Sequence, residues 1–193
     1  MIIKTFGLIL FFSLSESKNN FRPNLPLGEY RLVIDKVYPC GSRINHSVQF
    51  NIYSSKKTSN ITEMKGNITF LTPFNDNLAV DINFSSWGST GGWIPNYYIF
   101  RGKKACSNLR NLTGNSWFTF VKAFNIPTDR CPIPVDTYIT SGYDLTKFED
   151  NNLPKVFFYG KYKVVVRYKN VENKEVGCMV SEINFIRPWE TPI

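Results

Sequence analysis

The alternation of apolar and polar residues is the feature that most constrains the fold of this chain. The stretch NLAVDINFS, residues 77–85, has a large apolar residue at every second position. A two-residue period is the period of a β-strand that turns one face to a dry interior and the other to solvent. The fold must therefore cover this apolar face, either with other side chains or with a bound molecule.

Further segments of the same kind are short, rich in aromatic and β-branched residues, and separated by Gly, Pro, Asn and Asp. Together with residues 77–85, the predicted strands are residues 30–37, 47–54, 65–71, 97–101, 137–143, 159–168 and 176–186. Turn signals at short, regular intervals are typical of antiparallel sandwiches and barrels. We therefore predict an all-β fold, an antiparallel immunoglobulin-like β-sandwich.

One segment has the period of a helix instead. Its apolar residues lie at positions i, i+3, i+4 and i+7, which is one face of a helix. They are Trp117, Phe120, Val121 and Phe124, and Pro127 follows as a stop signal. We predict one short helix over residues 115–124, packed against a sheet.

The first residues indicate the compartment. MIIKTFGLILFFSLSES has Lys4 before an apolar run, then Ser15 and Ser17 at the spacing that a signal peptidase accepts. The run is too short to cross a membrane, which takes roughly 18 or more apolar residues. We predict a signal peptide over residues 1–17 and a single secreted, extracellular domain over residues 18–193.

The cysteines agree with an extracellular chain. There are four of them, Cys40, Cys106, Cys131 and Cys178, and none forms a CxxC pair that would indicate a zinc or redox site. Two disulfides are expected. Spacing alone leaves every pairing of the four open.

The chain also carries several N-glycosylation sequons, which predict a glycoprotein when they follow a signal peptide. Their asparagines are Asn45, Asn60, Asn67, Asn83 and Asn111. Asn67 and Asn83 lie on the polar faces of predicted strands, so a sugar at either position would turn that face to solvent.

The apolar faces of four predicted strands form rows that must point inward. The rows are Val48, Phe50 and Ile52; Ile68 and Phe70; Leu78, Val80, Ile82 and Phe84; and Tyr162, Val164 and Val166. The chain contains 16 Phe and 10 Tyr, and such side chains either fill a core or line a pocket for an apolar ligand. We predict that the rows line a ligand cavity between the sheets.

The sequence offers little for catalysis. The single histidine, His46, lies within a sequon and fits an exposed position at a strand edge. No GxSxG, HExxH or GxxxxGK[ST] motif is present, and GSTGG at residues 88–92 fits a flexible turn. Glu149 and Asp150 are adjacent in a predicted loop and point apart, unlike a hydrolase pair. We predict a protein that is not an enzyme and uses no cofactor or metal.

The net charge of +8 indicates, in a secreted protein, anionic membrane surfaces, acidic glycans or acidic ligands rather than nucleic acid, and it is equally consistent with a soluble surface that is simply basic. Four basic residues share the face of residues 161–169 that lies opposite the apolar row, namely Lys161, Lys163, Arg167 and Lys169. They form either a docking face for an anionic membrane or receptor, or a solvated strand face whose lysines deter edge pairing.

The C-terminal half contains landmarks in a specific order. They are Cys106 before a short helix, CPIPVDTY from Cys131, Leu153-Pro154, YGKY at residues 159–162, and Cys178 in the second strand of a final hairpin. In their order and spacing, over residues 30–186, the chain resembles the insect secreted chemosensory proteins often called CheB. That family is similar in turn to the ganglioside activator and the ML lipid-recognition superfamily. Asp136 departs from the pattern, which has glycine at this position.

The resemblance implies an ML-like sandwich that holds a lipid or long-chain hydrocarbon in an apolar cavity between its sheets, with a role in contact pheromone perception. It also implies the disulfides Cys40–Cys178 and Cys106–Cys131. Binding of this kind needs no chemistry, because each buried methylene contributes about 0.8 kcal/mol. An alternative function is an extracellular co-receptor or adaptor that acts mainly through protein contacts. A third is a secreted hydrolase that uses Glu149 and Asp150.

Overall fold

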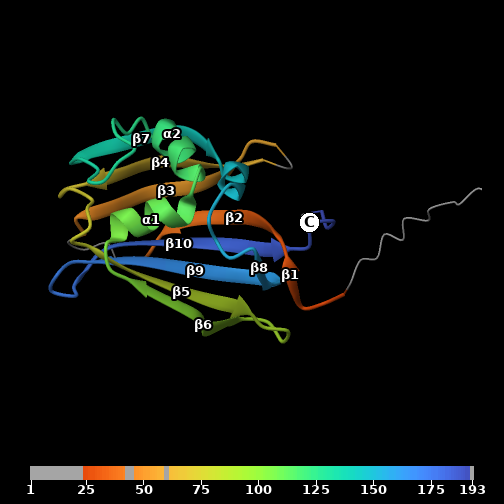
Figure 1. Ribbon diagram of the computed structural model, residues 1–193. Coiled ribbons are helices and arrows are strands. Elements are labelled where there is room, and N and C mark those ends of the chain that lie inside the picture. The colour runs from red at the N-terminus through yellow and green to blue at the C-terminus, as the bar shows by residue number, and fades with distance from the viewer. Residues whose placement is uncertain (1–23, 42–45, 59–60, 192–193) are drawn as a thin grey trace, which may run out of the picture.

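The computed structural model describes residues 24–41, 46–58 and 61–191 (Figure 1). Within these ranges the chain forms two antiparallel sheets, a separate strand pair, two α-helices and one 3-10 helix. The prediction of an all-β antiparallel sandwich is confirmed. The predicted signal peptide and the sequon asparagines Asn45 and Asn60 lie outside the described residues.

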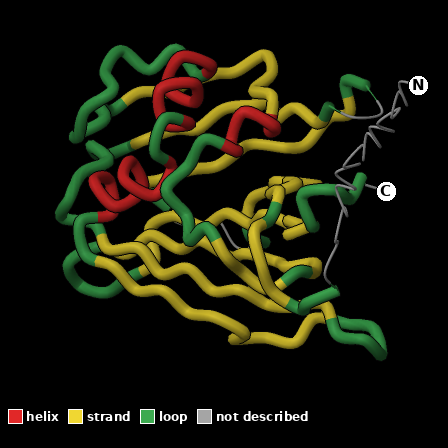
Figure 2. Tube along the Cα trace, turned by 45° about the vertical axis from the view of Figure 1, so that its right-hand side comes forward, coloured by secondary structure: helices red, strands yellow, loops and turns green. Residues whose placement is uncertain are grey.

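The larger sheet has five strands in the order β2-β10-β9-β5-β6. These strands are β2 (Arg31–Pro39), β5 (Ala79–Trp87), β6 (Trp93–Gly102), β9 (Gly160–Lys169) and β10 (Glu175–Ile186). The smaller sheet has the order β3-β4-β7, with β3 (Val48–Lys56), β4 (Thr62–Phe70) and β7 (Asp136–Asp144). Figure 2 shows the smaller sheet above the larger one. Each predicted strand matches one of these eight, with shifts only at the ends.

A pair of very short strands lies outside both sheets. Strand β1 (Leu27–Glu29) pairs only with β8 (Val156–Phe158), in antiparallel register. Figure 1 shows this pair at one end of the sandwich, beside β9 and β10. We call the pair the strap. The strap was not predicted from the sequence, because three residues are too few to show a period.

Two helices connect β6 of the larger sheet to β7 of the smaller one, α1 (Ala105–Thr113) and α2 (Ser116–Ala123). The predicted helix over residues 115–124 is α2. A further helix, α1, precedes it and was not predicted from the sequence. A residue outside the helix caps the first turn of α1. The Asp76 carboxylate accepts hydrogen bonds from the Ser107 amide and hydroxyl at 2.8 and 2.6 Å. A short 3-10 helix, η1 (Leu145–Glu149), follows β7.

Helix α2 delivers large side chains to the space between the sheets. Trp117 is 1% exposed and Phe124 is fully buried, and both belong to one packed cluster with the apolar faces of β3, β4 and β5. The Trp117 indole N–H donates a hydrogen bond to the Asp129 carbonyl at 2.8 Å, which satisfies its one polar atom. We call this cluster the main core.

Two disulfides join distant segments. Cys106 in α1 pairs with Cys131 before β7, and Cys40 after β2 pairs with Cys178 in β10, with Cα atoms 6.0 and 5.5 Å apart. Both pairs that the resemblance implies are therefore present. Two disulfides fit an extracellular protein. None of the helices in the described part of the chain is long and apolar enough to cross a membrane.

Candidate ligand site

The apolar rows predicted from the sequence all turn inward, but they divide between two clusters of packed side chains. Val48, Phe50, Ile52, Ile68, Phe70, Leu78 and Val80 lie in the main core, Phe84, Tyr162 and Val164 lie in a second cluster, and Ile82 and Val166 pack against both. The row from Leu78, just before β5, to Phe84 thus begins in one cluster and ends in the other.

In the main core these residues pack against protein side chains. Its row members are between 0 and 8% exposed, and Trp117 and Phe124 belong to the same cluster. Their burial is confirmed. A ligand cavity among them stays a prediction. Two pockets on the described part of the chain, one beside Arg187 and one beside Tyr30, are lined by other residues.

The second cluster lies on the inner face of the larger sheet, at the end where the strap is. Leu32, Tyr162, Val164, Ile183 and Phe185 are buried there, and Tyr30, Ile34, Ile82, Phe84, Phe148, Leu153, Phe157 and Val166 pack against them. Among these described residues, none comes from β3, β4 or β7. We call this set the strap cluster. At this end the larger sheet is therefore covered by the strap and by the segment after β7, rather than by the smaller sheet.

Phe157 of the strap lies at the centre of this cluster. Its ring centroid is 4.7 Å from that of Phe185, 5.7 Å from that of Tyr162 and 6.1 Å from that of Phe84. Aromatic pairs at such tilted or edge-on geometries contribute about 0.5–1.5 kcal/mol each beyond their burial. A single side chain therefore carries much of the contact between the strap and the sheet.

Half-exposed rings form a rim around the strap cluster. Tyr97 and Tyr98 of the edge strand β6 are 42 and 48% exposed, and Phe158 of β8 is 45% exposed. The Tyr97 centroid is 5.2 Å from that of Tyr162, and the Tyr98 centroid is 5.7 Å from that of Phe84. A continuous path of ring contacts therefore leads from solvent into the cluster.

The hydroxyl of Tyr162 is the polar group of the buried part. It donates to the Phe158 carbonyl of the strap at 3.1 Å. Burial, with a smaller effect from the Tyr97 phenol, raises the pKa of Tyr162 above its usual range. The phenol therefore stays neutral at physiological pH, and the strap cluster presents rings and aliphatic groups without a charge.

Tyr162, Val164, Ile82 and Phe84 were predicted from the sequence as site residues. Phe157, Phe185 and the two rim tyrosines were not. The segment KVFFYGKY, residues 155–162, contains four aromatic residues within eight positions. That density is the signal that could have drawn attention to the strap, although no periodicity accompanies it.

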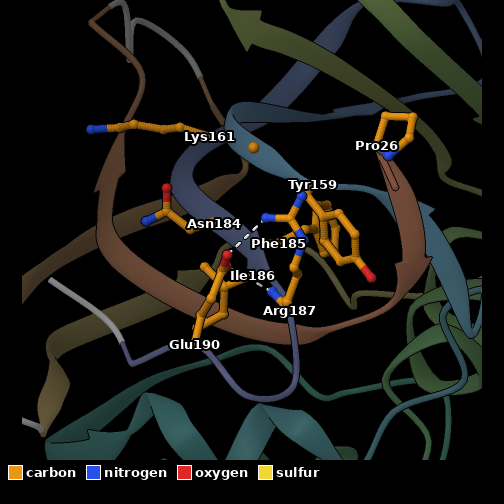
Figure 3. Close-up of a pocket in the computed structure, with 9 residues that line it drawn as sticks. Pro26, Tyr159, Lys161, Asn184, Phe185, Ile186, Arg187 and Glu190 are labelled. Atoms are coloured by element: carbon orange, nitrogen blue, oxygen red, sulfur yellow. Dashed lines mark hydrogen bonds and ion pairs between the residues drawn. The ribbon is translucent and has the colours of Figure 1, made fainter. Parts of the chain in front are cut away.

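A pocket of about 430 Å³ adjoins the strap on its other side (Figure 3). It is lined by Pro26, Tyr159, Gly160, Lys161, Asn184, Phe185, Ile186, Arg187 and Glu190. Phe185 belongs to both this pocket and the strap cluster. The pocket therefore offers polar groups close to the apolar site.

Arg187 is held firmly in this pocket. Its Nη1 lies 2.7 Å from Glu190 Oε1, its Nη2 donates to the Asn24 side chain and the Leu25 carbonyl, and its guanidinium carbon lies 4.6 Å from the Tyr159 ring centroid. Hydrogen bonds from the Arg187 amide and side chain lower the pKa of the Glu190 carboxyl. Lys161, the other charged residue of the lining, lies 3.5 Å from Glu182, so each charged side chain of the pocket has an opposite partner and the chemistry of the pocket is polar.

The four predicted basic residues do share the outer face of the larger sheet, but acidic residues of neighbouring strands accompany them. Lys161 lies 3.5 Å from Glu182, Arg167 3.2 Å from Glu175, and Lys169 3.4 Å from Asp81. Pairing with these carboxylates reduces the field that such a face projects. Among the described residues, Lys163 is the member of the four without a carboxylate within 4.0 Å.

The described sequon asparagines lie on solvent-facing surfaces, as predicted for Asn67 and Asn83. Asn67 accepts a hydrogen bond from Asn51 at 3.2 Å on the outer face of the smaller sheet. Asn83 donates to Asn96 at 2.6 Å on the outer face of the larger sheet. Asn111 is exposed on α1.

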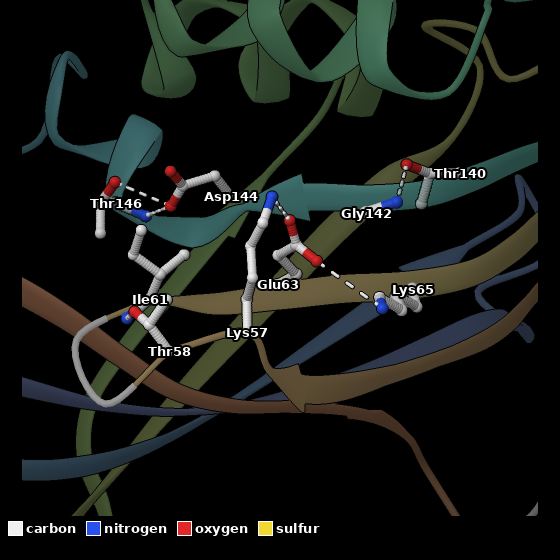
Figure 4. Close-up of polar contacts among 9 residues, drawn as sticks. All are labelled: Lys57, Thr58, Ile61, Glu63, Lys65, Thr140, Gly142, Asp144 and Thr146. Carbon is white, nitrogen blue, oxygen red and sulfur yellow. Dashed lines mark hydrogen bonds and ion pairs between the residues drawn. The ribbon is translucent and has the colours of Figure 1, made fainter.

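One buried carboxylate lies on the smaller sheet (Figure 4). The side chain of Glu63 is 10% exposed and is bridged by Lys57 at 2.7 Å and by Lys65 at 3.7 Å. The hydrogen bond from Lys57 is the main reason why the pKa of Glu63 is lowered. A Cβ atom at Gly142 would lie 2.8 Å from Glu63 Oε2, so glycine makes room for the carboxylate. A fully paired carboxylate of this kind fits a structural role.

The exposure predicted for His46 was wrong. The side chain is 8% exposed, and its Nε2 lies 3.4 Å from Oε1 of Glu175, at the start of β10. Glu149 and Asp150 are exposed at the end of η1 and after it, and the Asp150 carboxylate accepts a hydrogen bond from Asn115. In the described part of the chain, no group of three or more His, Cys, Asp or Glu side chains is placed to hold a metal ion.

Comparison with known proteins adds no assignment. No protein-family model matches the sequence, and no curated protein matches it significantly.

Proposed function

We propose that this protein is a secreted, non-catalytic carrier or presenter of an apolar ligand, a lipid or long-chain hydrocarbon, with a role in contact chemosensation. The observation that carries the proposal is the strap cluster, in which buried rings continue to a rim of half-exposed rings at Tyr97, Tyr98 and Phe158. Contiguous exposed apolar surface of this kind marks interaction sites or ligand-binding grooves in soluble proteins. The landmarks shared with the CheB and ML families support the same class of ligand.

The chemistry of the site favours an uncharged tail. The strap cluster supplies rings and aliphatic groups, and the phenol of Tyr162 remains neutral. A charged group placed there would lose its hydration without gaining a partner. The pocket at Arg187 and Glu190 adjoins the cluster through Phe185, and it suits a polar or zwitterionic end of the same molecule.

The first experiment asks whether such a ligand binds at all. The protein is expressed in a eukaryotic secretory host, organic extracts of the purified protein are analysed by mass spectrometry, and delipidated protein is titrated with a long-chain fatty alcohol. We expect saturable binding. If extracts contain no lipid and the titration shows no saturable binding, the proposed function is wrong.

The second experiment locates the site with matched tyrosine variants. Tyr98→Ser removes a rim ring that contacts Phe84, whereas Tyr53→Ser removes a 56% exposed ring from the smaller sheet. We expect Tyr98→Ser to weaken fatty alcohol binding about ten-fold, the effect of losing roughly 1.4 kcal/mol of contact, and Tyr53→Ser to leave it unchanged. Equal affinities in both variants would place the ligand elsewhere in the molecule.

A second candidate function, an extracellular adaptor or co-receptor, is favoured by strand β6. It lies at the edge of the larger sheet and pairs only with β5, and its consecutive residues Tyr97, Tyr98 and Ile99 are all exposed. An edge strand can accept a strand from a partner protein. Ile99→Lys would block that addition and leave the strap cluster intact. Loss of receptor binding in this variant, with fatty alcohol binding retained, would favour the adaptor.

A further inference from the structure

The outer face of the larger sheet carries an exposed tryptophan pair that the proposed function does not use. Trp87 and Trp93 close the β5–β6 hairpin with their ring centroids 5.0 Å apart, and Trp87 is 50% exposed. The Lys163 ammonium lies 4.8 Å from the Trp93 ring centroid. On the same face, Ile99 of β6 is 41% exposed. We call Trp87, Trp93, Ile99 and Lys163 the outer platform.

The sequon asparagine Asn83 lies beside this platform. In the register of the sheet it is opposite Ile99 on one side and opposite Val165 on the other. Lys163 is two residues before Val165, and such diagonal neighbours are about 7–8 Å apart. Trp87 lies four residues further along the same face of β5, roughly 13 Å at about 3.3 Å per residue.

The amide of Asn83 leans toward the platform strand. Its Nδ2, the atom that a glycan would modify, donates to the side chain of Asn96 in β6 at 2.6 Å. Asn96 has a positive φ of 59° and lies in β6 between Ile94 and Tyr98, where the pairing of β5 with β6 shifts register. A sugar on Nδ2 therefore starts above β6 and close to the end that holds the tryptophans.

We propose that Asn83 is N-glycosylated and that the core of its glycan lies across the outer platform. Pyranose rings have apolar C–H faces that pack on indole rings, and sugar hydroxyls and acetamide oxygens accept hydrogen bonds from lysine ammonium groups. Lys163, which lacks a carboxylate partner among the described residues, is a donor at a position diagonal to Asn83. A bulky, solubilising sugar here covers the apolar surface of Ile99, Trp87 and Trp93.

A glycan at Asn83 would decide whether the basic face of β9 docks to an anionic membrane or is a solvated strand face. Asn83 lies opposite Val165, between Lys163 and Arg167 along β9, so a glycan there stands over the middle of that face. A sugar of this size keeps a flat anionic membrane away from the lysines. The strap cluster lies on the inner side of the same sheet and stays clear of the glycan, so the inference is independent of ligand binding.

The test uses full-length protein secreted from a eukaryotic host, in a Trp189→Phe background. Of the four tryptophans, Trp117 is buried, so acrylamide quenching of fluorescence then reports on Trp87 and Trp93. Glycopeptide mass spectrometry measures occupancy of Asn83. We expect Asn83→Gln to red-shift the emission and roughly to double the quenching constant, because the platform becomes exposed. The matched sequon variant Asn111→Gln is expected to change neither value.

Enzymatic removal of glycans from the folded protein provides a second measurement that does not depend on folding of the variant. It is expected to give the same red shift in the parent chain and no shift in Asn83→Gln. An unmodified Asn83 in the glycopeptides overturns the inference. An occupied Asn83 whose removal leaves acrylamide quenching unchanged overturns it as well, because the sugar would then point away from the tryptophans.

Discussion

The main core and the strap cluster are built from the same alternating strands, yet they are closed in different ways. In the main core, two sheets and helix α2 enclose Trp117 at 1% exposure, and the Cys106–Cys131 disulfide ties helix α1 to the segment before β7. In the strap cluster, one sheet is covered by a pair of three-residue strands and by the ring of Phe157. The end that holds the main core, which we call the closed end, is thus built for stability. At the strap end the covering segment is short, and few other contacts hold it in place.

The largest expected effect is at the closed end. Trp117→Ala removes a fully packed indole and leaves the Asp129 carbonyl without its hydrogen bond donor. We expect the free energy of unfolding, measured by guanidinium denaturation, to fall by about 3–5 kcal/mol. Val171→Ala, at an 83% exposed turn position, is the control and should change it little. If Trp117→Ala lowered the free energy of unfolding less than Phe157→Ala, the strap variant considered below, the main core would not be the part that contributes most to stability.

The disulfide at the closed end should rank second. The double variant Cys106→Ser/Cys131→Ser opens a link between cysteines 25 residues apart. A loop of this length predicts a loss of about 3.5 kcal/mol in the free energy of unfolding. Fatty alcohol binding, measured below the unfolding transition, should be retained because the strap cluster contains neither cysteine. Loss of binding in a folded double variant would couple the two ends and contradict their separation.

At the strap end, Phe157→Ala should lower the free energy of unfolding less than the two closed-end changes do, and it should alter ligand binding more than they do. Phe157 is only partly buried, so we expect a loss of about 1–3 kcal/mol, below the range for fully buried phenylalanine. Removal of the ring vacates space against Phe185 and Tyr162, and the fatty alcohol should bind more tightly. Val156→Ala, at a 48% exposed position in the same strand, is the matched control. Weaker binding in Phe157→Ala would mean that the ring is part of the binding surface.

The closed end was easier to predict from the sequence than the strap end. The eight longer strands and α2 show their own period, so local pattern was enough to place them and to turn their apolar rows inward. The strap is set by the packing of Phe157 against rings of β5, β9 and β10, and no local pattern reports that contact. His46 is likewise buried by tertiary structure, and its nearest carboxylate, Glu175, is 129 positions later in the chain.

Helix α1 shows the same limit within the closed end. Its sequence, ACSNLRNLT, contains Asn, Ser, Thr and Cys, which are weak helix formers. Its residue Lys104, just before the helix, makes no side-chain cap, and the cap comes from Asp76 in an earlier turn. A helix that depends on a distant residue cannot be found from its own sequence.

The smallest predicted effect tests this distant cap. Asp76→Ala removes the acceptor of the Ser107 amide and hydroxyl, and loss of a helix cap costs about 1 kcal/mol of unfolding free energy at pH 7. Hydrogen bonds from Ser107 lower the pKa of Asp76 below its ordinary value of 3.8. The carboxylate therefore stabilises the fold fully above that value, and its contribution is lost as the pH falls through the lower pKa of the folded state.

Denaturation at a series of pH values should show the parent and Asp76→Ala converging in acid, whereas Asn77→Ala, one residue later, should follow the parent throughout. A difference that persists unchanged to acidic pH would show that packing around the turn, rather than the ionised cap, holds the start of α1.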